Sequence, residues 1–245
     1  MEVHHHPDLH HKNKKWKDYL LEFLMIFLAV TMGFIAENIR EHISEHKNAH
    51  ILAESLLEDL KKDTASLHTL LTYSNHKMKA IDSLLEILHS PRSSWDPKSL
   101  YTNLVPLFTA LPFRSTDGTI TQIKTSGTLR YFNQSLVNII NTYGVQLKKT
   151  EYRDEVEDKG TWILGNFNFD MVNSEVSTDI RLNKPVTHEM YINVNTKPLT
   201  DKMINLVSMI KAFRFRCMQE YSGQLSIGEK LIAALEKEYG LQDSH

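Results

Sequence analysis

The chain has 245 residues, of which 41% are hydrophobic and 24% are charged, and its formal net charge is −2. This length and composition allow a substantial core and exclude a disordered or collagen-like chain. The near-neutral charge argues against nucleic-acid binding, and the single cysteine, Cys217, excludes an internal disulfide framework. Only nine glycines and seven prolines are present, which favours long helices over a turn-rich β fold.

Residues 1–18 are rich in histidine and lysine and are expected to form a short tail. Neutral imidazoles at this density can bind Zn²⁺, Ni²⁺ or Cu²⁺. A flexible segment lacks the outer hydrogen bonds that fix metal ligands, so we favour a tail without a metal and expect no cofactor. The possible metal ligands of the tail are His4, His5, His6, His10 and His11.

Residues 19–36 form an apolar run with one charge, Glu22. A helix of this length spans about 27 Å, which is enough for the hydrocarbon core of a bilayer. A buried core helix and a cleavable signal peptide are the alternatives. A signal peptide is disfavoured because Phe34 would occupy the −3 position of a cleavage site after Ala36, where cleavage needs a small side chain. We therefore predict a single-pass transmembrane helix that is not cleaved.

The flanking charges predict the orientation of this helix. Four lysines lie within residues 12–17, whereas only Arg40 and Lys47 follow the run at a comparable distance. The positive-inside rule then places the N-terminus in the cytoplasm. Residues 37–245 would form an extracytoplasmic domain, which is periplasmic in a cell with two membranes.

One face of the predicted transmembrane helix is suited to packing. Ala29 and Gly33 form a pair of small residues that allows another helix to approach closely. Glu22 on this face either serves a proton path or, as we favour, extends toward the headgroups. The expected partners are the lipid bilayer and either other membrane-protein subunits or a second copy of the chain. The face consists of Glu22, Ile26, Ala29, Gly33 and Ala36.

Residues 37–89 contain neither glycine nor proline and carry an apolar seam with a 3.5-residue repeat. Such a repeat is typical of a coiled coil or a long bundle helix, so we predict a stalk that continues the transmembrane helix. The seam positions are Ile39, Ile43, His46, His50, Ala53, Leu57, Leu60, Thr64, Leu67, Leu71, Ser74, Met78, Ile81, Leu85 and Leu88.

Three histidines, His42, His46 and His50, lie at steps of four near the start of the stalk. Two histidines with this spacing on a helix can share one metal ion. In an oligomeric stalk, their protonation would instead place like charges in the seam and loosen it. We favour a third interpretation, a solvated polar stretch without either role.

The remaining sequence predicts a helical bundle. Residues 165–198 are rich in asparagine and threonine and alternate polar with apolar side chains, which indicates an irregular or β insert such as a short hairpin. The fold class is therefore mainly α, with Thr116, Asn133 and Thr200 as expected N-caps. The expected helices are 37–89, 98–110, 116–127, 134–162 and 200–239.

No signature of a serine hydrolase, P-loop, dinucleotide site, zinc protease or kinase is present. We expect Cys217 to be structural rather than a nucleophile, although neighbouring arginines could lower its pKa. Residues 148–159 read as a surface helix with many ion pairs. Trp95, Trp162 and Tyr191 could line a pocket, although aromatic residues in a bundle usually belong to the core.

Three stretches of the chain resemble a family of bacterial membrane proteins classed as a domain of unknown function. They are EFLMIFLAVTMGFIAENIREH (22–42), GTITQIKTSGTLRYFNQSLVNIINTY (118–143) and GEKLIAALEKEYGL (228–241). The resemblance implies one N-terminal transmembrane helix in the inner membrane of a Gram-negative bacterium and a helical domain outside the cytoplasm. It implies no activity, and the histidine-rich start departs from the short basic start that is commoner in the family.

Two functions remain in view at this stage. The first is a non-enzymatic single-pass membrane protein that acts as an accessory, scaffold or interaction subunit of a bacterial envelope complex. The alternative is a periplasmic sensor or small-ligand-binding bundle. Because the cytoplasmic part is so short, a sensor would have to signal through a partner.

Overall fold

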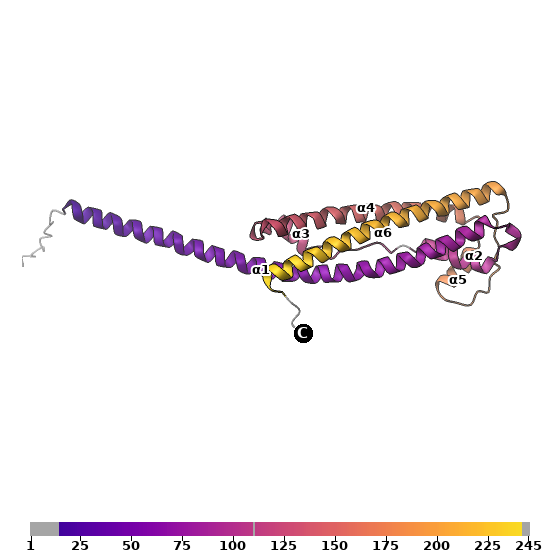
Figure 1. Ribbon diagram of the computed structural model, residues 1–245, viewed down its shortest axis with the longest axis horizontal. Helices are drawn as coiled ribbons and strands as arrows, with labels where there is room; N and C mark the ends of the chain where they lie inside the picture. The colour runs from indigo at the N-terminus through magenta and orange to yellow at the C-terminus, as the bar shows by residue number, and fades with distance from the viewer. Residues whose placement is uncertain (1–14, 110, 242–245) are drawn as a thin grey trace, which may run out of the picture. The chain divides into compact units, whose positions relative to one another are not determined.

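A computed structural model describes residues 15–109 and 111–241, and it is mainly α as predicted (Figure 1). The described residues contain six α-helices and no β-strand. The chain divides into two compact units, 1–49 and 50–245, which are described separately. The helices are α1 (Trp16–His89), α2 (Pro97–Leu104), α3 (Gly118–Thr125), α4 (Gln134–Asn168), α5 (Ser174–Arg181) and α6 (Lys197–Tyr239).

The described part of the first unit is the N-terminal portion of α1. It contains the one helical stretch among the described residues that is long and apolar enough to cross a membrane, and none of that stretch is buried. This is compatible with a membrane anchor or a signal sequence. The five histidines of the tail lie outside the described residues.

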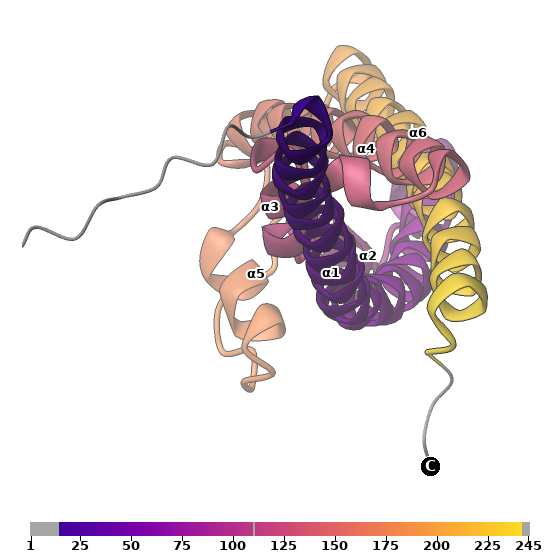
Figure 2. The same cartoon turned by 90° about the vertical axis from the view of Figure 1, so that its left-hand side faces the viewer.

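The second unit is built on three long helices: α1 from His50 onward, α4 and α6. Hydrogen bonds join Asp63 to Tyr143 and Lys77 to Glu157, so α1 and α4 run in the same direction. The helix α6 returns antiparallel to both, and α5 lies away from α6 in both views (Figures 1 and 2).

The 3.5-residue period of the seam is present in the bundle, but the buried row differs from the predicted one. Ala53, Leu57, Leu60, Leu67, Ser74, Ile81 and Leu88 are buried as expected, whereas Thr64, Leu71, Met78 and Leu85 are only half-buried. The alternate positions one residue earlier are buried instead, because two helices cover α1 rather than one. These positions are Asp63, Leu70, Lys77 and Leu84.

The expected N-caps have mixed outcomes. Asn133 caps α4, since its side-chain oxygen accepts a hydrogen bond of 2.9 Å from the amide of Leu136. Thr116 does not cap α3, because its amide donates to the Asp63 carboxylate instead. Thr200 lies inside α6, which begins three residues earlier at Lys197 with a proline in its first turn.

Of the predicted irregular or β insert in residues 165–198, the β alternative is wrong, and the irregular one holds for residues 182–196. The helix α4 continues to Asn168, α5 follows, and a single antiparallel bridge joins Val172 to Ile192. The alternating runs 167–171 and 190–194 are five residues each, and the first begins within α4. The predicted 98–110 helix is also shorter than expected, since α2 ends at Leu104 and a 3₁₀ turn, Val105–Phe108, follows.

A non-helical segment, residues 111–117, lies along the bundle and is called the strap below. Its backbone and hydroxyl groups bond to carboxylates of the long helices. Asp63 accepts from the Ser115 hydroxyl at 2.6 Å and from the Thr116 amide at 2.7 Å. Asp154 accepts from the Phe113 amide at 2.9 Å. These carboxylates satisfy backbone donors that would otherwise be unpaired.

Candidate functional site

The predicted packing face of the apolar stretch lies on one uninterrupted helix. Ile26 on this face is 62% exposed, and the neighbouring Phe34 is 72% exposed. A Cβ atom added at Gly33 would meet no atom within 4 Å. The backbone at this position is therefore open to a neighbouring helix.

The histidines of the stalk make separate, local contacts. His42 lies 3.9 Å from Glu45, and His50 lies 3.3 Å from Glu54, with its ring edge against Tyr239. His46 is exposed. No group of three or more histidine, cysteine, aspartate or glutamate side chains among the described residues is placed to hold a metal ion.

The centre of the bundle contains a buried charged group that joins all three long helices. Lys77 of α1 and Arg214 of α6 both donate to the same oxygen, Oε1 of Glu157 on α4, at 3.0 and 2.9 Å. Arg214 also donates to the Ser74 hydroxyl at 3.2 Å. Side-chain exposure of the three charged residues is 1%, 3% and 5% for Lys77, Arg214 and Glu157. We call these three residues the buried triad.

Burial and mutual contact shift the pKa values in this region. Burial lowers the pKa of Lys77, although Glu157 opposes the shift. Burial also disfavours the charged form of Arg214, but the Glu157 carboxylate outweighs it, so the pKa of Arg214 is raised. Burial raises the pKa of Asp154, whose carboxylate accepts from the Tyr221 hydroxyl.

The expectation that residues 148–159 form a surface helix holds only in part. Glu157 is buried and Asp154 is half-buried, because both carboxylates have partners on other segments. Cys217 is fully buried, and burial raises the pKa of its thiol. The thiol therefore stays protonated, which is the structural role we expected rather than that of a nucleophile.

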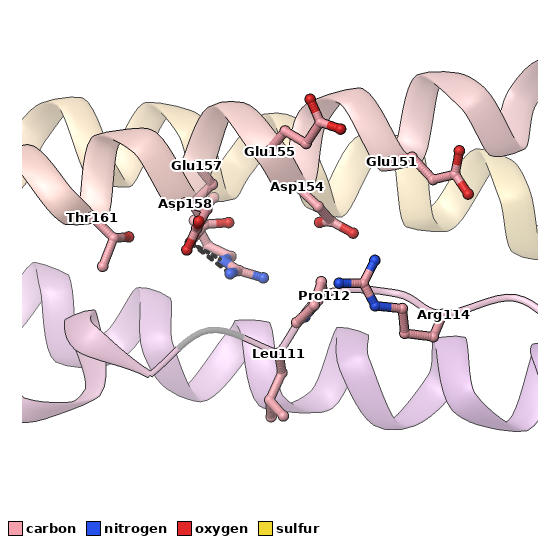
Figure 3. Close-up of a pocket in the computed structure, with 10 residues that line it drawn as sticks. Leu111, Pro112, Arg114, Glu151, Asp154, Glu155, Glu157, Asp158 and Thr161 are labelled. Atoms are coloured by element: carbon pink, nitrogen blue, oxygen red, sulfur yellow. Dashed lines mark hydrogen bonds and ion pairs between the residues drawn. The ribbon is translucent and has the colours of Figure 1, made fainter.

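A cavity of about 290 Å³ lies between α4 and the strap, beside the buried triad (Figure 3). Arg114 extends from the strap toward α4, where Asp154 lies. Five carboxylates and two guanidinium groups line the cavity, so its formal charge is −3 when all are ionised. The lining residues are Leu111, Pro112, Arg114, Glu151, Asp154, Glu155, Glu157, Asp158, Thr161 and Arg214.

A second cavity, of about 430 Å³, lies between α4 and α5 and is called the groove below. Trp162 of α4 and Phe169, which directly follows the last residue of α4, line it and are each 65% exposed. The facing helix α5 contributes three hydroxyl groups. The lining residues are Phe108, Asp158, Thr161, Trp162, Gly165, Asn168, Phe169, Ser174, Ser177, Thr178 and Arg181.

Of the three aromatic residues proposed to line a pocket, only Trp162 lies at one of these cavities. Trp95 packs against the core, and its indole nitrogen donates to the carbonyl of Ser90. The polar lining of α5 was missed because the sequence did not predict that helix. Its polar face recurs at steps of three and four from Ser174, a helical signal that the strand interpretation obscured.

Comparisons with models of protein families, with curated proteins and with solved structures found no match to this chain. The resemblance to a family of bacterial membrane proteins therefore stays a prediction.

Proposed function

We propose that the chain is a single-pass protein of a bacterial inner membrane, with a short cytoplasmic N-terminus and a periplasmic helical bundle. Its role is that of a non-catalytic accessory or scaffold subunit that associates through its membrane helix. The observation that supports this most directly is the exposed apolar stretch with an open backbone position at Gly33.

Several features agree with an anchor that is retained. The helix α1 continues without a break through Ala36, where a signal peptide would be cut. Exposed side chains such as Phe23 and Phe34 need a non-aqueous neighbour over the whole circumference of the helix. Lipid meets this need on most faces, and a second helix fits the face where the side chains are smallest.

The experiment compares two substitutions of equal kind in the full-length protein. Gly33→Leu fills the open position without an internal clash, whereas Thr31→Leu changes a side chain on the opposite face. Each variant is purified from its native membrane in mild detergent, and co-purifying proteins are quantified by mass spectrometry. We expect Gly33→Leu to reduce association about tenfold and Thr31→Leu to leave it unchanged.

The outcome also separates two forms of the proposal. A stoichiometric companion protein identifies an accessory subunit, and a self-associated species identifies a scaffold. If neither variant changes any association, the packing face is not used and the proposal is wrong on that point.

The groove favours a second function, that of a small-ligand-binding bundle. Its volume lies within the range of about 300–1,000 Å³ that is usual for small-molecule sites. A specific and saturable rise in the unfolding temperature of the full chain on addition of a ligand would support this function. Ligand binding in the groove is compatible with membrane association.

A further inference from the structure

The groove between α4 and α5 has two walls of different chemistry. On one wall, Trp162 of α4 and Phe169 at its C-terminal cap are largely exposed. From α5, Ser174, Ser177 and Thr178 present hydroxyl groups. A ligand that fits must therefore have one apolar face and one edge rich in hydrogen-bonding groups.

A buried amide without a partner lines the same groove. Asn168 is 7% exposed, and its side-chain oxygen is buried and accepts no hydrogen bond within the described residues. Buried amides in proteins are nearly always paired, so an unpaired one needs an explanation. A hydroxyl group of a bound ligand would supply the missing donor.

Two charged groups of opposite sign complete the lining. The side chains of Asp158 and Arg181 make no hydrogen bond or ion pair with any described residue. Their formal charges cancel, which disfavours a strongly anionic or cationic ligand. A carboxylate that accepts and a guanidinium that donates in pairs are well suited to neighbouring hydroxyl groups.

Gly165 of α4 has no side chain, which leaves space in the groove for a ring of a ligand. Gly165 lies on α4 between Trp162 and Phe169, and a Cβ atom there would have a single neighbour within 4 Å, the Phe108 ring at 3.9 Å. The position is therefore open on the groove side, with Phe108 as its floor.

We propose that the groove binds a neutral saccharide. A pyranose ring has a C–H face that packs on an aromatic ring and an edge of hydroxyl groups that donate and accept hydrogen bonds. The Trp162 and Phe169 rings fit the first, and the amide, hydroxyl and charged groups fit the second. The ligand is either a free oligosaccharide or a segment of a glycan chain. This inference rests on the second function proposed for the groove and names its ligand class, and it requires no membrane partner.

The test uses the full chain in nanodiscs prepared with a detergent that has no sugar headgroup, since such a headgroup would compete for the groove. Soluble tetramers of N-acetylglucosamine and of glucose are titrated by calorimetry, and insoluble chitin is used for retention. Saturable binding of a tetramer is expected. Retention on chitin identifies a glycan chain, and binding of tetramers alone identifies a free saccharide.

Two variants attribute the binding to the groove. Gly165→Leu fills the groove without an initial clash, and Trp162→Ala removes an aromatic wall; each is expected to weaken binding about tenfold or more. Phe215→Ala, which removes a ring 51% exposed on α6, is the matched control and is expected to change nothing. Circular dichroism of each variant establishes that the bundle remains folded.

Three results would overturn the proposal. One is the absence of saturable binding to every saccharide tested. Another is binding that Gly165→Leu leaves unchanged. The third is equally tight binding of hexanol, an apolar probe without a row of hydroxyl groups. None of these results bears on membrane association through Gly33.

Discussion

Residues 19–36 and the centre of the bundle place their side chains in opposite ways, although α1 contributes to both. In the apolar stretch, large side chains such as Phe23 and Phe34 are 64% and 72% exposed. In the bundle, the charged groups of Lys77, Glu157 and Arg214 are almost wholly buried. Both segments are α-helical, so they differ only in the surroundings that their side chains require. The apolar stretch requires a non-aqueous neighbour, and the buried charged groups require opposite charges.

The largest effect is expected from removing the shared carboxylate of the buried triad. Glu157→Gln leaves two buried cations without a counter-charge, so the free energy of unfolding should fall by about 3–5 kcal/mol. Glu155→Gln, on an exposed position of the same helix, is the control and should change it by less than about 0.5 kcal/mol. Urea denaturation of the full chain, followed by circular dichroism, measures both. Equal stability of the two variants would mean that the triad contributes nothing.

The second prediction concerns the apolar stretch, in which a charged side chain is added rather than removed. Phe27→Lys places an ammonium group near the middle of the predicted span, at a cost to insertion of about 2.5–3.5 kcal/mol. Membrane insertion should fall accordingly, while the free energy of unfolding of the bundle stays unchanged. A membrane-insertion reporter measures the effect, with Phe27→Leu as control. A lysine variant that inserts as well as wild type would contradict the transmembrane assignment.

The smallest effect is expected at His188, whose ring nitrogen lies 2.9 Å from Asp179 of α5. The hydrogen bond to Asp179 raises the pKa of His188 above its ordinary value of 6.5. A raised histidine pKa means that the stabilisation is complete below about pH 6.5 and is lost as the pH rises through the folded-state pKa. His188→Gln should remove this pH dependence. The pH profile of unfolding and an NMR titration of the ring check it, and an unshifted ring pKa would refute it.

The sequence predicted those features of the fold that arise from local pattern. The apolar stretch, the 3.5-residue period of α1 and the Asn133 cap each depend on neighbouring residues. The identity of the buried row did not follow, because Asp63 and Lys77 occupy core positions that a charged residue normally avoids. Their burial depends on Tyr143 and Glu157, each 80 residues away in the chain.

The candidate site was less predictable than the fold for the same reason. The groove depends on α5, whose position against α4 brings Ser174 and Trp162 to one cavity. Asn168 has no sequence signal that marks it as unpaired, since that property belongs to its surroundings. Of the residues that line the groove, Trp162 alone was among the aromatic residues that the sequence indicated as possible pocket residues.

The buried triad also constrains when the bundle can form during synthesis. Glu157 and Arg214 are separated by 57 residues, so the carboxylate is made well before the guanidinium that pairs with it. At a ribosomal rate of about 5–20 residues per second, this interval is roughly 3–11 s. During that time α1 and α4 can associate only with an incomplete set of charges. The contacts of α6 form last, and a chain that ends before Arg214 is expected to be more open to proteases than the full chain.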